Sequence, residues 1–508
     1  LRLLGLGPAV TLNRFNNVTG WSKKPKLDVH RKHPDGTFKV HFVTNEMAQR
    51  DDPMKTSAKP EGVFRVLAVG DSFTLGFGVQ REDLFVDLLE DRWNAEGRKI
   101  EVVNIGTEGW STDQEAAWLE ARAAEWNPDL VLLFPYENDI YWNSQEAYIG
   151  GKQKPRYSLA GRLEKRSLQE VDNKTWKSRY ALTHWLEEQP DASAHIFRPE
   201  GASRPILKEF APLLNAAPDF LADCELRTKA ALGAAREACA SAGAELIVCP
   251  IPSHAAIDPE YAPETAKRAL GGLSPTRWSA DRPVDFFLDA CSELGIATID
   301  SRERLRSRLS ADTPLYWTQD WHFDPSGNRA FAEILYGELE GRGVFPEDYA
   351  RPESVAAATT EDWKQPAGSR GPKGDGWKRL AMLFGGLWVL LSTMYCLTYE
   401  DDRVLGPLKV GALLATIFGI VYGLQTLLGS VPPQIGQILM LLFVAGILGF
   451  VIYKLGNRVG TIAELFKSFT LRGHWYLMPL VVVLLSIGSL LVVAASSPLV
   501  APFIYTLF

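Results

Sequence analysis

Short apolar runs alternate with helical patterns through the first two thirds of the chain. Apolar runs predict strands at 64–69, 100–105, 129–134, 245–249 and 296–300. Apolar residues spaced by three and four predict helices at roughly 85–93, 112–126, 218–242, 283–294 and 325–339. The run at 129–134 is almost wholly apolar, which is typical of a parallel strand covered on both faces. The alternation predicts an α/β fold, with an open parallel sheet between two layers of helices.

A different pattern begins near residue 379. Charged residues become sparse, and Leu, Val, Ile and Gly form apolar stretches at 380–398, 408–428, 435–453 and 476–505. Each stretch is close to the ~20 residues that a helix needs to cross a bilayer. A single stretch of this kind is also typical of a buried helix in a soluble domain. Four in succession predict an all-α transmembrane bundle, with the lipid bilayer as its partner.

These patterns divide the chain into four parts. Residues 1–60 are polar and lack sustained periodicity, so we interpret them as an irregular N-terminal arm packed against the first domain. Residues 61–350 form the α/β domain, in which the polar segment 143–205 is interpreted as an insertion near the mouth of the site. Residues 351–378 are rich in Pro, Gly, Ala and charge, as linkers are. Residues 379–508 form the transmembrane region, with about four helices.

Net charge and cysteine spacing exclude some classes of function. The formal net charge is −7 and no basic stripe is present, which argues against nucleic acid as a partner. Five cysteines are scattered without CxxC or Cys/His spacing, so neither a zinc site nor a disulfide framework is expected. No metal and no cofactor are predicted. The cysteines are Cys224, Cys239, Cys249, Cys291 and Cys396.

Three short polar blocks come directly after predicted strands. Ser72 lies in Gly-Asp-Ser after the first strand, where it would be exposed on a turn beside the positive end of a helix dipole. The second block, 104–110, contains glycines that let the backbone aim an N–H group at a ligand. Asn138 follows the third strand, and its amide can donate to a developing oxyanion. Each block taken singly is more typical of an ordinary turn at a strand end.

A fourth block precedes the last predicted helix and supplies a base. A serine hydroxyl needs a base to act as a nucleophile at neutral pH. Asp320 and His322 are two residues apart, and histidine, with an ordinary pKa of about 6.5, suits that role. Asp320 can orient the imidazole and stabilise its charged form. Asp324 or Ser326 can cap the helix that begins at Pro325, which leaves Asp320 and His322 for chemistry.

In this order, the four blocks resemble those of the SGNH/GDSL hydrolase family, over roughly residues 62–345. The resemblance implies a flavodoxin-like three-layer α/β/α fold and acyl-ester chemistry without a metal. It also implies a role for each matching residue: Ser72 is the nucleophile, His322 the base and Asp320 its orienting acid. The oxyanion hole would consist of the backbone N–H groups of Ser72 and Gly109 and the side chain of Asn138.

Two blocks depart from the family's pattern. The third usually reads Gly-x-Asn-Asp, whereas Tyr136 occupies the glycine position here, which would narrow the pocket or shift the strand end. The last block is Asp-x-His instead of the longer Asp-x-x-His, as in many family members. Aromatic residues flank the blocks, and they are candidates for the substrate pocket, with simple packing as the alternative. These candidates are Phe73, Trp110, Tyr141 and Trp142.

Loop charges predict the orientation of the membrane region. The loop at 454–475 carries four Lys or Arg residues, the loop at 399–407 carries Arg403, and the loop at 429–434 carries none. The hydrolase domain is therefore expected on the extracytoplasmic side, in a multi-pass protein of the bacterial inner membrane. Export would need a signal or anchor, and the apolar stretch 1–8 is interpreted either as the end of one or as a surface arm. The final stretch, from 471 onward, resembles a family of small bacterial membrane proteins of unknown function.

Three functions remain in competition after this reasoning. The first is a membrane-anchored serine esterase or acylhydrolase that cleaves an acyl ester, with acetyl as one candidate for the acyl group, on a cell-surface glycan or lipid. The second is an O-acetyltransferase that uses the same serine and a sugar hydroxyl as acceptor. The third is a non-catalytic binding module in a membrane assembly with other membrane proteins, against which the intact serine, asparagine, aspartate and histidine count.

Overall fold

The structure is a computed structural model that describes most of residues 12–352. The described ranges are 12–32, 38–148 and 151–352, with gaps at 166, 170–194, 311–312 and 319, together with Trp363 and scattered positions between 385 and 415. The chain divides into one compact unit, Val10–Gly371, and a second made of Leu1–Ala9 and Pro372–Phe508. Within the described ranges, no helix is both long and apolar enough to span a membrane. The four predicted membrane helices lie outside those ranges, apart from the scattered positions.

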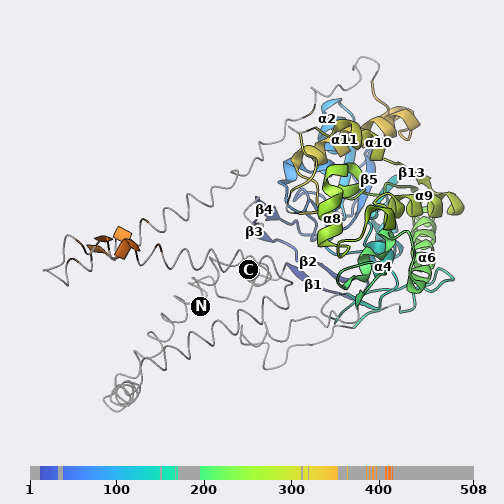
Figure 1. The fold of residues 1–508 in the computed structure, drawn as a ribbon. Coiled ribbons are helices and arrows are strands. Elements are labelled where there is room, and N and C mark those ends of the chain that lie inside the picture. Colours follow the sequence, from blue (N-terminus) through green and yellow to red (C-terminus); the bar gives the residue numbers. More distant parts are fainter. Residues whose placement is uncertain are drawn as a thin grey trace, which may run out of the picture. The chain divides into compact units, whose positions relative to one another are not determined.

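A five-stranded parallel sheet forms the centre of the larger unit (Figure 1). Its order is β13-β12-β7-β5-β6, and all neighbours pair in parallel. Relative to the chain, this is the order 5-4-3-1-2, which is that of flavodoxin-like sheets. The strands are β5 (Phe64–Gly70), β6 (Ile100–Asn104), β7 (Leu130–Phe134), β12 (Glu245–Val248) and β13 (Ala297–Thr298). The predicted parallel α/β fold is confirmed.

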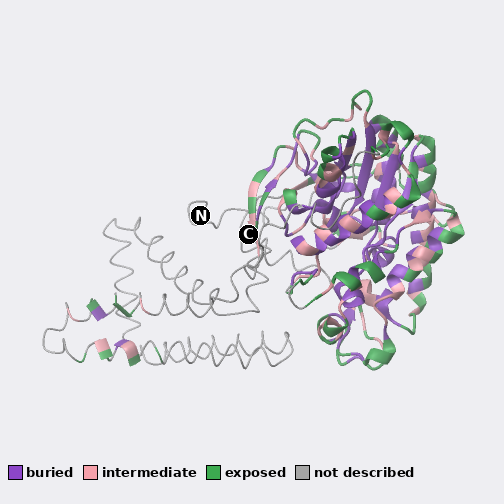
Figure 2. Ribbon diagram, turned by 90° about the horizontal axis from the view of Figure 1, so that it is seen from above, coloured by how far each residue is buried: buried purple, intermediate pink, exposed green. Residues whose placement is uncertain are grey.

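Helices cover both faces of this sheet, because β5 and β7 are apolar on both. Along β5, Val66 and Ala68 face one core and Leu67 and Val69 face the other. The first core is closed by α2 (Phe85–Ala95), α10 (Arg302–Arg308) and α11 (Pro325–Arg342). The second is closed by α3 (Thr112–Trp126), α6 (Asp219–Ser241) and α9 (Arg282–Leu294). Figure 2 shows the strands buried between helices whose outer faces are exposed.

The helix boundaries follow from local sequence signals. A capping box, Ser111 with Gln114, begins α3, and Asn127 ends that helix in the left-handed conformation. Gly295 and Gly343 end α9 and α11 in the same conformation. Asp324 caps α11 by accepting a hydrogen bond from Gly327 N, with Pro325 in the first turn. The helices over 112–126, 218–242, 283–294 and 325–339 were thus predicted to within a few residues.

The N-terminal arm differs from the expectation of irregular structure. It contains two antiparallel hairpins, β1 (Asn13–Asn16) with β2 (Gly20–Lys23) and β3 (Asp28–Lys32) with β4 (Lys39–Val43). The prediction was wrong because the strands are short. In β4, for example, Val40 and Phe42 are buried, whereas Lys39 and His41 are exposed.

Short elements connect the sheet to the rim of the domain. After β7 come α4 (Asp139–Trp142) and the hairpin β8 (Ala147–Tyr148) with β9 (Lys152–Gln153). The hairpin β10 (Ile196–Phe197) with β11 (Ile206–Leu207) leads to the short helix η6 (Lys208–Leu213). Two further helices, α7 (His254–Ile257) and α8 (Ala262–Arg268), follow β12. The middle of the predicted insertion, 170–194, lies outside the described residues.

Candidate active site

Ser72 begins a one-turn helix, α1 (Ser72–Leu75), at the carboxyl end of β5. Asp71 caps this turn, and its side chain accepts a hydrogen bond of 2.8 Å from Phe73 N. Gly76 then ends the turn with φ of +83°, a conformation that favours glycine. The strand thus delivers the serine hydroxyl to the sheet edge where ligands bind in open α/β folds.

His322 reaches Ser72 from the loop before α11. Ser72 Oγ lies 2.7 Å from His322 Nε2, and His322 Nδ1 contacts Asp320 Oδ1. A carboxylate is an acceptor only, so the proton lies on Nδ1 and leaves Nε2 free to accept the serine O–H. The same Asp320 oxygen also accepts a hydrogen bond of 2.9 Å from His322 N, which fixes the two residues relative to each other. The structure therefore brings Ser72, His322 and Asp320 together.

Two aromatic rings pack against the imidazole. The ring of Phe73 lies 4.7 Å from that of His322, and the ring of Phe77 lies 4.6 Å from it. The backbone of the loop is closed by a hydrogen bond from Trp317 N to His322 O and by pairing of Tyr316 with Phe323. The imidazole is consequently fixed by packing as well as by Asp320. Sequence reasoning missed Phe77, which lies five residues after the serine.

The second block forms a turn directly after β6. Asn104 donates to Thr74 O at 2.8 Å and accepts from Gly106 N at 2.8 Å, which ties this turn to the serine turn. Gly106 lies so close that a Cβ there would come within 2.2 Å of Leu75 N. Gly109 has φ of +75° and lines the same pocket as Ser72. Its backbone conformation explains why glycine occupies this position.

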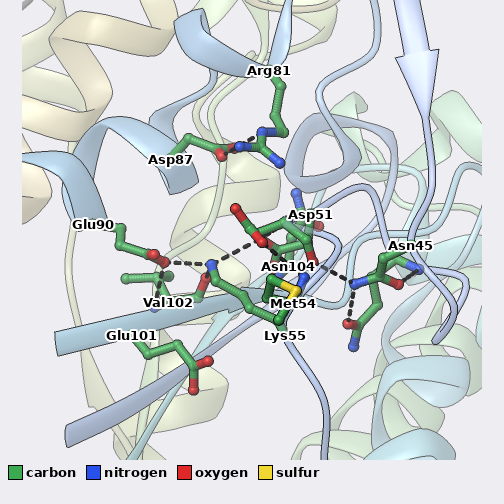
Figure 3. A network of polar contacts seen from close by, with 12 residues as sticks. Asn45, Asp51, Met54, Lys55, Arg81, Asp87, Glu90, Glu101, Val102 and Asn104 are labelled. Atoms are coloured by element: carbon green, nitrogen blue, oxygen red, sulfur yellow. Dashed lines mark hydrogen bonds and ion pairs between the residues drawn. The ribbon is translucent and has the colours of Figure 1, made fainter. Parts of the chain in front are cut away.

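A network of charged side chains supports Asn104 (Figure 3). Asp51 accepts a hydrogen bond of 2.8 Å from Asn104 N, and Lys55 lies 2.8 Å from Asp51. Lys55 also pairs with Glu90 of α2 and donates to Val102 O at 2.7 Å. One lysine therefore connects the segment before β5 to α2 and β6. The start of the second turn is thus anchored by charged groups that are far apart in the sequence.

Asn138 follows β7 and occupies the N-cap position of α4, without a capping hydrogen bond from its side chain. It lines the pocket beside Ser72, and its Oδ1 has no hydrogen-bond partner in the part of the chain that the structure describes. Asp139 turns inward, where it accepts hydrogen bonds from Thr112 Oγ1 and Tyr136 N. Burial, reinforced by the charge of Asp71, raises the pKa of Asp139 well above its usual range. Asn138 faces the pocket while its neighbour belongs to the core.

A pocket of about 620 Å³ opens over these turns. It is lined by Ser72, His322, Asp320, Gly109 and Asn138, and its walls come from the arm, from β8–β9 and from η6. Aromatic and charged side chains share the walls, which suits a polar ligand with some apolar surface. The other lining residues are Leu12, Asn13, Trp21, Arg31, Asp71, Phe73, Phe77, Glu108, Tyr136, Glu137, Tyr148, Lys152, Glu209, Phe210 and Trp321.

Of the four aromatic candidates for this pocket, one lines it. Phe73 does, whereas Trp110, Tyr141 and Trp142 lie behind the wall, each at most 3 % exposed. Their polar atoms bond other groups: Trp110 Nε1 donates to Trp21 O and Trp142 Nε1 donates to Glu209. Their positions next to the motifs in the sequence did not show whether each side chain would point into the pocket or into the core.

Tyr136, where the family pattern has glycine, lies just after the end of β7 and points into the site. It is buried, lines the pocket, and packs its ring 4.8 Å from that of Phe73. Burial raises the pKa of Tyr136 well above its usual range, so the phenol stays neutral. The extra ring fills space next to the serine turn.

The pKa values of two carboxyl groups beside the site are shifted in opposite directions. Burial raises the pKa of Asp71 to about 6, although the Phe73 N–H group and His322 oppose the shift. Burial would raise the pKa of Glu108 as well, but the charges of Lys23 and Arg31 outweigh it and hold that pKa well below its usual range. Sequence reasoning missed Glu108 and Arg31, because no spacing linked the arm to the second block.

The geometry defines a class of protein: an open parallel α/β sheet with a serine, a histidine and an aspartate in contact at its carboxyl edge. Comparison with known families agrees for part of the chain. Residues 221–369 match the family described as "SGNH hydrolase-like domain, acetyltransferase AlgX". This match includes Asp320 and His322 and confirms the resemblance to SGNH hydrolases over that range. Residues 459–508 match a family of unknown function, DUF5989.

Several solved structures are similar to this chain. The structure titled "TesA" is 14% identical over 55% of this chain and 98% of its own, with a TM-score of 0.31. A lipase/acylhydrolase from Enterococcus faecalis is 15% identical over 55% and 97%, with a TM-score of 0.29. The acetyl xylan esterase AlAXEase is 13% identical over 54% and 100%, with a TM-score of 0.31. No curated protein sequence matches this chain.

Proposed function

We propose that this protein is a serine acyl-ester hydrolase that works through an acyl-enzyme intermediate. The observation that carries the proposal is the contact of 2.7 Å between Ser72 Oγ and His322 Nε2, with Asp320 on the other ring nitrogen. That contact is within the reach required of a nucleophile and its base. The substrate would be an acyl ester on a glycan or lipid, with acetyl as one candidate for the acyl group.

In the proposed mechanism, His322 accepts the hydroxyl proton of Ser72 as the oxygen attacks the ester carbonyl. The new oxyanion accepts hydrogen bonds from Ser72 N, Gly109 N and the Asn138 amide. His322 then gives its proton to the leaving alcohol, and Asp320 stabilises the imidazolium in between. The same imidazole then accepts a proton from a water molecule that attacks the acyl-enzyme, and it returns this proton to Ser72 Oγ as the carboxylic acid is released. No step requires a metal or cofactor.

Acyl transfer to a sugar hydroxyl is the second candidate. The family that matches residues 221–369 is described as an acetyltransferase, and the pocket of about 620 Å³ has room for an acceptor beside an acetyl group. The chemistry to the acyl-enzyme is unchanged, and only the group that resolves it differs. Both candidates depend on Ser72, so one variant tests them together.

The test is turnover of p-nitrophenyl acetate by the purified full-length chain. Ser72→Ala is expected to lower kcat by at least 10⁴-fold, since it removes the attacking atom. Ser307→Ala, an exposed serine of α10, is the matched control and should change kcat less than twofold. A fluorophosphonate should label the wild type and not Ser72→Ala. Equal turnover by wild type and Ser72→Ala would refute the proposal, whereas acetylated polysaccharide formed on addition of a glycan would favour transfer.

We further propose that residues 379–508 hold the protein in a bacterial inner membrane, with the hydrolase domain outside the cytoplasm. The support is the series of four apolar stretches and the Lys and Arg residues of the loops at 399–407 and 454–475. A cysteine introduced at the exposed Ser307 should react with an impermeant maleimide on intact spheroplasts. Labelling only after permeabilisation would contradict this orientation.

A further inference from the structure

Side chains of the N-terminal hairpins pair with Glu108, in the turn that carries Gly109. Glu108 accepts contacts of 2.7 Å from Lys23 Nζ and 3.0 Å from Arg31 NH2, one on each carboxylate oxygen. The Lys23 side chain is fully buried, and that of Arg31 is 24% exposed. Burying an ammonium group without a partner has a high cost in free energy, so the pairing of Lys23 with Glu108 holds this part of the arm against the turn.

A second contact acts on the backbone of the same turn. Trp21 Nε1 donates to the carbonyl oxygen of Glu108 at 3.0 Å, and Trp110 Nε1 donates to Trp21 O at 2.9 Å. The carbonyl of Glu108 and the N–H of Gly109 belong to one peptide unit, which is planar. A donor that fixes one end of this plane therefore fixes the direction of the N–H at the other end.

Arg31 also packs on the ring of Phe77, which contacts His322. Its guanidinium lies 4.9 Å from the centre of the Phe77 ring, and that ring lies 4.6 Å from the His322 ring. One arm residue thus contacts the carboxylate beside Gly109 and the aromatic ring that packs on the base. A planar guanidinium can do both, because it donates in its plane and stacks on its face.

We propose that Trp21, Arg31 and Glu108 are positioning residues that aim the Gly109 N–H at the oxyanion of the acyl-transfer reaction. The inference rests on the proposed function and assigns a role to the arm, which sequence reasoning treated as packing alone. Trp21 acts on the peptide plane, and the Lys23–Glu108–Arg31 cluster holds the turn against the arm. Neither contact requires these side chains to touch the reacting atoms.

The effect should appear in kcat, because an oxyanion donor strengthens its bond mainly in the transition state. Trp21→Phe keeps an aromatic ring and removes the hydrogen bond to Glu108 O, and we expect kcat to fall about tenfold with KM within twofold. Glu108→Gln should lower kcat at least as much. Arg31→Gln should lower it about three- to tenfold, and Arg31→Lys should restore part of the loss.

Two matched controls separate this role from general damage to the arm. Glu46→Gln removes the carboxylate of an exposed pair, since Lys26 lies 2.7 Å from Glu46 with both side chains more than two thirds exposed. Trp118→Phe alters a half-buried tryptophan of α3 that packs against Trp126. Both should keep kcat within twofold of the wild type.

The experiment uses the full-length chain and p-nitrophenyl acetate, with melting temperature measured for every variant. A lower kcat in Trp21→Phe and Arg31→Gln at unchanged KM supports the inference, and these two variants decide if Glu108→Gln does not fold. If the wild type turns over substrate and both Trp21→Phe and Arg31→Gln keep kcat within twofold of it, this inference alone is overturned, even if the melting temperatures of the two variants fall. A wild type without turnover would overturn the proposed function and this inference with it.

Discussion

The turns that carry Ser72 and Gly109 follow adjacent strands, but they are held in different ways. The serine turn is closed mainly by its own residues: Asp71 accepts from Phe73 N, and Gly76 N donates back to Ser72 O. The Gly109 turn depends on side chains about 80 to 90 residues away in the sequence. A locally closed turn is visible as a motif, whereas a turn held from a distance depends on the whole fold.

The largest expected effect concerns the Ser72 side of this comparison, through the residue that orients its base. Asp320→Asn should lower kcat by about 10³- to 10⁴-fold, because an amide can donate to His322 Nδ1 and stabilise the wrong tautomer. The measurement is the kcat of p-nitrophenyl acetate hydrolysis by the full-length chain. Asp258→Asn is the control, since Asp258 lies 3.7 Å from His254 outside the pocket. A loss below tenfold in Asp320→Asn would show that Phe73 and Phe77 suffice to orient the base.

A smaller effect is expected for the side-chain donor of the oxyanion hole. Asn138→Ala should lower kcat by about 10²- to 10³-fold with little change in KM, the usual loss when one such donor is removed. Asn215→Ala, at an exposed asparagine that donates to Thr276 O, serves as the control. If Asn138→Ala instead raised KM at constant kcat, the amide would bind the ground state and the oxyanion hole would lie elsewhere.

Much of the fold was predictable because its signals are local. Apolar runs marked the five strands, and apolar residues spaced by three and four marked the helices at 112–126, 218–242 and 283–294. The hairpins of the arm were not predictable in this way, because strands of four or five residues show too few alternations to indicate a period.

The site divides along the same line. Ser72, Asn138, Asp320 and His322 each lie in a block next to a strand end or helix start, and the structure places all four around one pocket. Glu108 stood inside a quoted block, yet nothing in the sequence paired it with Lys23 or Arg31. Pairing between distant charged residues is a tertiary property, and only the fold shows which of many Lys and Arg residues a given carboxylate meets.

The serine turn also has contacts with residues remote in the sequence, and the contact with Arg50 can test how independent the turn is. Arg50 is buried and donates to the carbonyl oxygens of Leu75, Gly76 and Val79. Arg50→Met should destabilise the domain by about 3 kcal/mol, since it leaves these buried carbonyls without a donor. Thermal unfolding of the full-length chain measures the loss, with Arg14→Met as an exposed control. A tenfold loss of kcat at preserved folding would show that the serine turn also depends on the arm.

The smallest expected effect is a difference in pH dependence between the two turns. Burial raises the pKa of Asp71 to about 6, so the folded chain holds that proton more tightly than the unfolded chain. Stability due to this group increases as pH falls from about 6 towards the ordinary value of 3.8. The pKa of Glu108 is shifted downward by Lys23 and Arg31, so its contribution is full above the ordinary value of 4.5 and is lost below it.

Melting temperatures of the wild type, Asp71→Asn and Glu108→Gln between pH 7 and pH 4 test this difference in sign. As pH falls, the wild type should gain about 2–6 °C relative to Asp71→Asn, most of it between pH 6 and pH 4. Relative to Glu108→Gln the wild type should gain nothing and should begin to lose below about pH 4.5. Carboxyl groups remote from the substituted side chain titrate equally in wild type and variant, so each difference reports on that side chain together with the groups coupled to it, such as Asp139 in the case of Asp71. If the difference in melting temperature from the wild type changed with pH in the same way for both variants, the two turns would share one electrostatic environment. The contrast between a turn closed by its own residues and a turn held by distant side chains would then fail.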